Sequence, residues 1–110
     1  MDKSMNDILN TEYSTKFDDI RKKMMIMSYY KYGPVKDDYS KYKCINAIES
    51  LKLRLEAYEK SGNTEYLADI ANFAMIEFMY PQHPNAKYIP TDGGVEISGF
   101  GINEINNEVE

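Results

Sequence analysis

Apolar residues along this chain recur mostly at intervals of three and four, which is the spacing of amphipathic helices. The spacing predicts helices over 14–32, 40–60 and 64–80. After Tyr80 the helical period disappears, and the last 30 residues hold three of the four prolines and four of the six glycines. We therefore expect a mainly α protein, a small three-helix domain followed by an irregular C-terminal arm.

Capping residues set the expected boundaries of the first helix. Thr11 or Ser14 supplies a hydroxyl N-cap. Gly33 followed by Pro34 ends the helix, because glycine tolerates a left-handed cap and proline cannot continue. Residues 34–40 are then expected to form a loop. The apolar stripe of this helix is expected to contain Phe17, Ile20, Met24 and Met27.

About three residues, Ser61-Gly62-Asn63, separate the second helix from the third. Gly62 is the expected C-terminal glycine of the second helix. Asn63 or Thr64 caps the third, which Pro81 stops. A connection this short forces the two helices into an antiparallel hairpin. One face of the second helix is expected to carry Cys44, Ile48, Leu51, Leu55 and Tyr58.

The third helix, TEYLADIANFAMIEFMY, is apolar on nearly every side, which is typical of the central, buried element of a small protein. It nevertheless contains Asp69, Asn72 and Glu77, and burying a carboxylate without a partner costs several kcal/mol. At about 100° per residue these side chains span roughly 140°, so one pocket could contain all three. Arg54 of the second helix is a natural partner for Glu77 or Asp69. A polar network that fixes helix register and a ligand site both remain open.

The C-terminal arm is expected to be extended, with turns at 84–85 and 92–94 and a short strand piece over 94–97. His83 is the only histidine and lies in the sequence PQHP, where a turn residue is expected. We assign 1–95 to a single helical domain and 96–110 to a flexible acidic tail.

Composition fits one folded domain, because 110 residues with 43% hydrophobic side chains suffice for one modest core. The only cysteine, Cys44, excludes an internal disulfide framework. No apolar run approaches the roughly 18 residues of a membrane span. The N-terminus MDKSMNDILN lacks the apolar core of a signal peptide, so we expect a cytoplasmic protein with no membrane partner.

Charge is divided unevenly along the chain, whose net charge is -5. Residues 1–60 contain twelve Lys/Arg and ten Asp/Glu, whereas residues 61–110 contain one lysine, Lys87, and eight acids. Either the acidic part is a solvated tail, or it forms a surface that imitates nucleic acid or meets a basic partner. With so little positive excess, we expect no binding to duplex nucleic acid.

Four carboxylates lie around the predicted hairpin turn. Glu56 and Glu59 are three residues apart near the end of the second helix, and Glu65 and Asp69 are four apart at the start of the third. Carboxylates on facing helices can hold magnesium, a hard cation that prefers oxygen ligands. Alternatively the three glutamates are solvated or cap helices, and Asp69 pairs with one Lys or Arg.

Tyrosine and lysine alternate in SYYKYGPVKDDYSKYK, residues 28–43, which holds five of the ten tyrosines. Aromatic rings stack on bases or anchor protein interfaces, and lysine pairs with phosphate. Tyr29, Lys31 and Tyr32 are the expected contacts, together with Arg54 if the ligand is a nucleotide. The alternative is that some of these rings cover the core while the lysines keep the surface soluble.

The segments KYGP (31–34), NAIESLKLRLEAY (46–58), SGN (61–63), EYLADIANFAMIEFMYPQHPNAKY (65–88) and TDGG (91–94) resemble a family of small uncharacterised proteins. Phages and mobile elements of Gram-positive bacteria carry this family. The similarity covers about residues 28–95. Because many small phage proteins counter host immunity by sequestering a protein or a nucleotide, the resemblance implies such a role.

The same hairpin is more distantly similar to the all-α nucleotide pyrophosphohydrolases of the MazG kind, whose ExxE and ExxD elements bind magnesium. Glu56-Ala-Tyr-Glu59 matches the first element. The second element departs, because Glu65 and Asp69 are four residues apart and Tyr66 stands where its glutamate would be. The resemblance implies a magnesium site at Glu56, Glu59, Glu65 and Asp69.

Together these patterns predict a small non-enzymatic binding protein that needs no cofactor. The expected role is counter-defence, as an anti-CRISPR-like or nucleotide-sequestering inhibitor that binds a host protein or a nucleotide. The alternative is a Mg-dependent, MazG-like nucleoside triphosphate pyrophosphohydrolase. A homodimer is expected, because the chain has more apolar surface than 110 residues easily bury. The residues expected to bind a ligand or partner are Tyr29, Lys31, Tyr32, Arg54, Asp69, Asn72 and Glu77.

Overall fold

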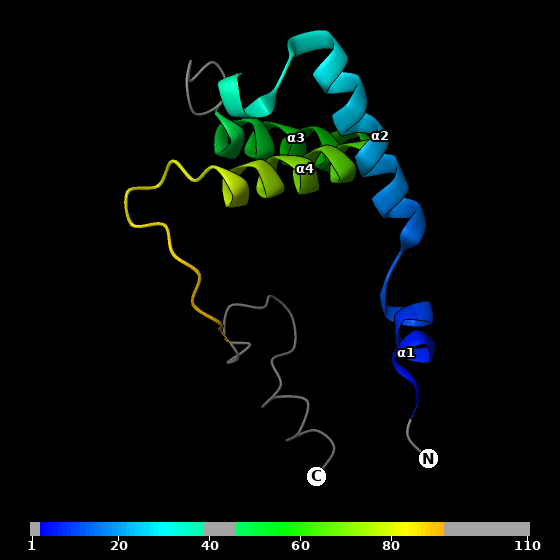
Figure 1. Cartoon of the computed structure of the whole chain (residues 1–110). Coiled ribbons are helices and arrows are strands. Elements are labelled where there is room, and N and C mark those ends of the chain that lie inside the picture. The colour runs from blue at the N-terminus through cyan, green and yellow to red at the C-terminus, as the bar shows by residue number, and fades with distance from the viewer. Residues whose placement is uncertain (1–2, 39–45, 92–110) are drawn as a thin grey trace.

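Helices account for the regular structure of residues 3–38 and 46–91, the part of the chain that the computed structural model describes (Figure 1). They are α1 (Met5–Glu12), α2 (Thr15–Tyr32), α3 (Ala47–Ser61) and α4 (Glu65–Met79). No strand is present in these residues. The mainly α fold is thus confirmed, and the short helix α1 precedes the three helices that the sequence predicts.

The first two helices begin at serine caps. The Ser4 side chain accepts a hydrogen bond from the backbone N–H of Asp7, whose own side chain accepts from the Ser4 N–H, so α1 opens with a capping box. The predicted cap Ser14 accepts from the Phe17 N–H at 3.0 Å and starts α2. Only Tyr13 and Ser14 separate the two helices, and both have extended backbones.

Gly33 ends α2 as predicted, with φ 84° and ψ −168°, a backbone region that essentially only glycine adopts. The expected loop over 34–40 is wrong in its first part. A helical turn forms immediately after Gly33, where the Pro34 carbonyl accepts hydrogen bonds from the N–H groups of Asp37 and Asp38. Proline is well tolerated at the start of a helical turn, because a backbone N–H at that position would have no partner within the turn.

The third helix of the structure, α3, begins at Ala47 rather than near Ser40. Asn46 has an extended backbone and its side chain accepts from the Glu49 N–H at 3.0 Å, so Asn46 is the N-cap. The hydrophobic period alone did not reveal this asparagine cap. Residues 39–45, including Cys44, lie outside the described part.

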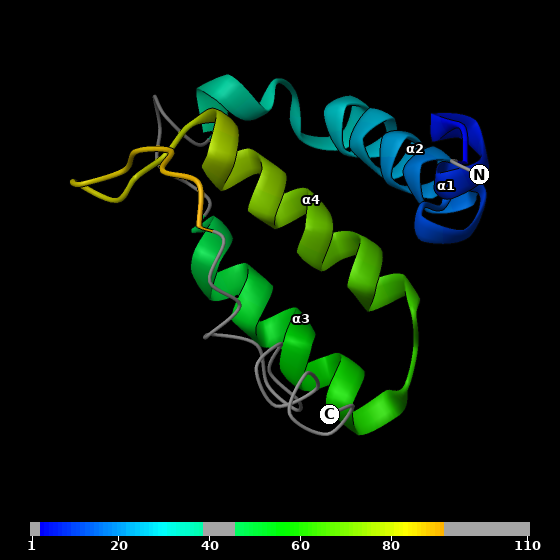
Figure 2. The ribbon, with the colours of Figure 1, turned by 90° about the horizontal axis from the view of Figure 1, so that it is seen from below.

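The predicted antiparallel hairpin is confirmed, with α3 and α4 packed side by side (Figure 2). Gly62 is the left-handed C-cap of α3, at φ 72° and ψ 11°. Of the two predicted N-caps of α4, Asn63 supplies the side-chain bond, accepting from the Glu65 N–H at 3.1 Å. Thr64 occupies the cap position without a side-chain hydrogen bond.

Helix α4 is the central element, with α3 on one side and α2 on the other (Figure 2). Its buried residues Ala68, Asn72 and Ile76 follow one another at intervals of four. Ile76 packs with the fully buried Ala47 at the start of α3. Met25, Val35, Phe73 and Tyr80 are partly buried around this pair.

The predicted apolar faces of the two flanking helices are partly wrong. On α2, Ile20 and Met27 are exposed, whereas Met25 packs against the core. On α3, Ile48 and Leu55 are exposed. The spacing of apolar residues alone therefore does not identify the inward faces of these two helices, because those faces also contain polar residues.

The two ends of the described chain lie away from the three-helix body (Figure 1). Helix α1 has no buried residue. After α4, the predicted turn at 84–85 is present, closed by a hydrogen bond from the Ala86 N–H to the His83 carbonyl at 3.1 Å. The turn predicted at 92–94, the strand piece over 94–97 and the acidic tail 96–110 fall outside the described residues. None of the described helices has the length and apolar character to cross a membrane.

Candidate binding surface

The first of the three polar residues of α4, Asp69, pairs with Arg54 of α3. Arg54 Nε donates to Asp69 Oδ2 at 3.1 Å, and the two side chains are 43% and 25% exposed, respectively. The prediction that Arg54 partners an acid of this helix is therefore confirmed, with Asp69 as the acid. This ion pair ties α3 to α4 near the hairpin turn.

Asn72, the second polar residue, is 5% exposed and faces α2 instead. Its Oδ1 accepts from Arg21 Nε at 3.2 Å, and its Nδ2 donates to the Arg21 carbonyl at 3.2 Å. Both functional groups of the amide are thus satisfied by one residue of α2. This two-point contact fixes where α2 crosses α4.

Glu77, the third, contacts the segment that follows its own helix. Its Oε2 accepts from the N–H groups of Gln82 at 2.8 Å and His83 at 3.4 Å. Asp69, Asn72 and Glu77 therefore have three different sets of partners, on α3, on α2 and at the start of the arm. They stabilise helix contacts and do not line one shared pocket.

The four carboxylates around the hairpin turn are not gathered into a metal site. In the part of the chain that the structure describes, which includes Glu56, Glu59, Glu65 and Asp69, no three His, Cys, Asp or Glu side chains are placed to hold a metal ion. Asp69 is engaged by Arg54. The arrangement gives the magnesium-dependent alternative no geometric support.

The sequence did not predict the role of Arg21, which makes several contacts between α2 and α4. Besides Asn72, it pairs with Asp18 at 3.6 Å, lies 5.8 Å from the centre of the Phe17 ring and approaches the sulfur of Met75. The available signal was its position, four residues after Phe17 and four before Met25. An arginine on an apolar face suggests a polar partner on the opposing helix.

The end of α2 carries three exposed tyrosines. Tyr29, Tyr30 and Tyr32 are 56%, 81% and 68% exposed, and the rings of Tyr29 and Tyr30 meet edge to face at 6.1 Å. Lys31 lies among them and is also exposed. We call Tyr29, Tyr30, Lys31 and Tyr32 the tyrosine surface.

A groove of about 420 Å³ adjoins the tyrosine surface, with Tyr29 on its wall. The end of α4 and the helical turn after Pro34 form the rest of it. Its lining is mostly apolar and comprises Met25, Tyr29, Pro34, Val35, Lys36, Met75, Ile76, Met79 and Tyr80. Methionine side chains repack readily around different apolar partners, so this groove suits a protein side chain or a short helix.

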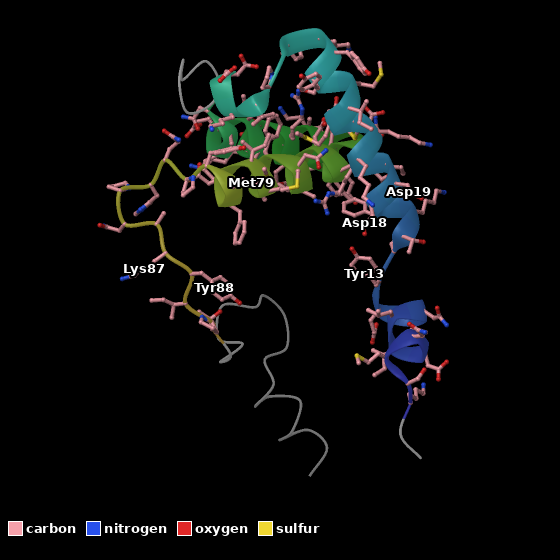
Figure 3. The ribbon with its side chains drawn as sticks, viewed as in Figure 1. Tyr13, Asp18, Asp19, Met79, Lys87 and Tyr88 are labelled. Carbon is pink, nitrogen blue, oxygen red and sulfur yellow. The ribbon has the colours of Figure 1, made fainter. Side chains whose placement is uncertain are left out.

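Two further grooves lie along α4. One, of about 520 Å³, lies between α2 and α4 and is lined by Tyr13, Asp18, Arg21, Lys22, Met25, Ile26, Asn72 and Met75. The other, of about 500 Å³, lies between the end of α4 and the arm and includes Phe78, Lys87 and Tyr88. Figure 3 shows Tyr13 and Asp18 at the α1–α2 side of the molecule and Lys87 and Tyr88 on the arm.

The hydroxyl of Tyr13, between α1 and α2, has a perturbed pKa. Its hydroxyl donates to the Asp18 carboxylate, and this hydrogen bond raises the pKa of Tyr13 above its ordinary value of 10.0. The bond spans the junction between α1 and α2. It therefore orients α1 relative to the body.

The predicted nucleotide contacts do not converge on one site. Tyr29 lines a groove with Met79 and Tyr80, whereas Arg54 is bound to Asp69. Ten residues of α4 separate Asp69 from Met79, which is about 15 Å along the helix. Arg54 thus belongs to the hairpin contact and not to the tyrosine surface.

No family model matches this chain, and neither a curated protein nor a solved structure matches it. The resemblances to phage-borne proteins and to MazG-like enzymes therefore stay predictions from the sequence.

Proposed function

We propose that this chain is a small, non-enzymatic protein-binding protein whose partner docks on the tyrosine surface and its adjoining groove. The observation that carries the proposal is the imbalance between buried and exposed apolar side chains. In the described residues, only Ala47, Ala68 and Ile76 are buried apolar residues, whereas seventeen large apolar side chains are exposed. Large contiguous apolar patches are rare on monomeric soluble proteins and usually mark interaction sites.

The composition of the tyrosine surface is that of an interface. Tyrosine supplies a large contact area at little cost in side-chain entropy, and it is enriched among the residues that dominate binding energies. The 81% exposed Tyr30 and the 68% exposed Tyr32 are available to such a partner without rearrangement of the helices. Lys31 adds a charge at the rim, where charges mainly steer association and define specificity.

The biological setting of the proposal comes from the sequence. The resemblance to proteins of phages and mobile elements supports a counter-defence role, in which binding inhibits a host protein. The exposed apolar surface also supports a homodimeric form, because a second copy can cover what one chain leaves open.

Site-specific photocrosslinking tests the proposal. Tyr32 is replaced by the photoreactive aromatic residue benzoylphenylalanine, which preserves its ring, and the protein is irradiated in cells of the organism that carries it. Lys52, exposed on α3, is the matched control position. We expect a covalent adduct with another protein at position 32 and none at position 52. No adduct at position 32, or the same adduct from both positions, would contradict the proposal.

Thermal melting with a panel of nucleotides tests the nucleotide-binding version separately. A ligand present at 100 times its Kd stabilises the folded state by about 2.7 kcal/mol, a shift that is easily measured. A protein-binding function predicts no shift with linear or cyclic nucleotides. If a nucleotide raises the melting temperature and the variant Tyr32→Ala abolishes this shift, the tyrosine surface binds a nucleotide instead of a protein.

A further inference from the structure

Helix α1 is an amphipathic helix that packs on no core. Met5, Ile8, Leu9 and Glu12 follow the spacing i, i+3, i+4, i+7 and therefore form one stripe. Met5 is 81%, Ile8 46% and Leu9 50% exposed. The capping box at Ser4 nevertheless gives this helix a defined start. The apolar stripe of this capped helix is therefore open to a partner.

We propose that α1 of one copy docks in the α2–α4 groove of a second copy, so that two chains exchange their N-terminal helices in a symmetric homodimer. This inference rests on the dimeric form within the proposed function. It names the surface that makes the dimer. This α2–α4 groove contains none of the residues of the tyrosine surface, although it shares Met25 and Met75 with the groove beside that surface.

The groove between α2 and α4 matches α1 in length and character. It follows α2 from Asp18 to Ile26, eight residues on, which is about 12 Å along the helix axis, and α1 with its eight residues is also about 12 Å long. Met25, Ile26 and Met75 supply apolar contacts in the groove. Ile26 is 56% exposed and therefore open to an incoming side chain.

Charge complementarity favours a second copy as the occupant. Helix α1 carries Asp7 and Glu12 and no basic residue, whereas α2 carries five basic and two acidic residues. In the groove, Asp18 is paired with Arg21, which leaves Lys22 as the lining charge without an ion pair among the described residues. Glu12 on the stripe of α1 also has no ion pair in that part of the chain. Docking therefore brings Glu12 of one copy to Lys22 of the other.

The connection between α1 and α2 directs α1 away from its own body (Figures 1 and 3). Tyr13 and Ser14 are extended, and the Tyr13 hydroxyl is held by Asp18 at the rim of the groove. Because Tyr13 directly follows α1 and lines the groove, α1 would have to reverse direction at this extended residue to enter the groove of its own chain. In a two-fold dimer the same contact forms twice, which doubles the apolar area that is covered.

Charge reversal in trans tests the exchange. The dissociation constant of the full-length protein is measured by sedimentation over a range of concentrations for wild type, Glu12→Lys and Lys22→Glu. Each single variant places two like-charged pairs in the dimer, and we expect dissociation to become about tenfold easier or more. An equimolar mixture of the two variants can form a heterodimer in which both pairs are again opposite in charge. We expect the mixture to regain wild-type affinity.

Lys23→Glu is the matched control, because it changes the net charge as Lys22→Glu does but lies outside the groove lining. We expect its dissociation constant to stay within about twofold of wild type. Helix content by circular dichroism verifies folding. The variants should not disturb it, because α1 has no buried residue and Lys22 and Lys23 are exposed on α2.

Three results would overturn the exchange: a monomeric wild-type protein, single variants that dimerise like wild type, and a mixture that fails to recover. None of these results affects the photocrosslinking test at Tyr32. Failure of the exchange is therefore distinguishable from failure of the protein-binding function.

Discussion

The buried amide of Asn72 should contribute more to stability than the more conspicuous ion pair between Arg54 and Asp69. Asn72 is 5% exposed and makes two hydrogen bonds to Arg21, each at 3.2 Å. A hydrogen bond of this kind contributes about 1 kcal/mol net. The Arg21 carbonyl keeps its own helical bond, so Asn72→Ala strands no acceptor completely. We expect Asn72→Ala to lower the free energy of unfolding by about 2 kcal/mol.

The ion pair is worth less because water competes for it. Arg54 and Asp69 are 43% and 25% exposed, and solvent-exposed pairs typically contribute about 0.2–1 kcal/mol. Asp69→Asn also retains an oxygen that can accept from Arg54. We therefore expect Asp69→Asn to lower the free energy of unfolding by less than about 1 kcal/mol.

Urea denaturation followed by circular dichroism at 222 nm measures both variants. One protein concentration is used throughout, because the proposed dimer would make the apparent stability depend on concentration. A double-mutant cycle of Arg21→Met with Asn72→Ala isolates the bond from Arg21 Nε, since the carbonyl bond survives in Arg21→Met. A coupling energy of about 1 kcal/mol is expected. A larger loss in Asp69→Asn than in Asn72→Ala, or a coupling energy near zero, would refute the reasoning.

Three further predictions concern backbone, ionisation and packing. Gly33→Ala should lower the free energy of unfolding by about 2–3 kcal/mol and Gly62→Ala by about 1 kcal/mol, because only Gly33 lies in the backbone region essentially reserved for glycine. Equal losses of stability in urea denaturation would contradict this prediction. Because the pKa of Tyr13 is raised above 10.0, its bond to Asp18 is fully present below that pH and is lost as pH rises through the folded pKa. Phenolate absorbance at 295 nm, taken as a difference from Tyr13→Phe, should show that pKa falling toward 10.0 in Asp18→Asn, and an unchanged titration would exclude the bond. Ala47→Leu should destabilise the protein by about 1–3 kcal/mol in the same urea assay, because Ala47 is 0% exposed; a stable variant would mean that the core has room.

Local signals predicted the helix ends well where one residue decides the boundary. Ser14 starts α2, Gly33 ends it and Gly62 ends α3, each as expected. These residues act through their own side chains or backbone freedom, so their effect needs no distant partner. The start of α3 was misplaced because its cap, Asn46, lies inside a stretch of continuing helical period.

Which residues face inward was harder to predict, because amphipathic helices with more than one apolar flank have more than one plausible face. Ile48 and Leu55 were expected inside and are exposed. Arg54 faces α4, where Asp69 offers a charge partner. The spacing of large apolar residues reveals neither the close packing at the small Ala47 nor the ion-pair partner of Arg54. Both features determine how α3 packs on α4.

The candidate surfaces show the same division. The tyrosine surface was visible in the sequence as a run of aromatic and lysine residues, and the structure places Tyr29, Lys31 and Tyr32 on the exposed end of α2. The proposed pocket of Asp69, Asn72 and Glu77 required a common partner, which an arc on one helix cannot guarantee. Their partners come from α3, α2 and the arm, and the carboxylates near the turn remain dispersed.

The sequence by itself determined that the chain is helical, that α3 and α4 form a hairpin and that α4 is central, because spacing, caps and a three-residue connection are local properties. Only the tertiary structure decided that Arg21 satisfies Asn72, that α1 stands away from the body and that few apolar residues are buried in the described part of the chain. Those outcomes depend on where separate helices meet. Arg21 and Asn72 are 51 residues apart in the sequence, so their contact depends on how α2 packs on α4 and not on either segment alone.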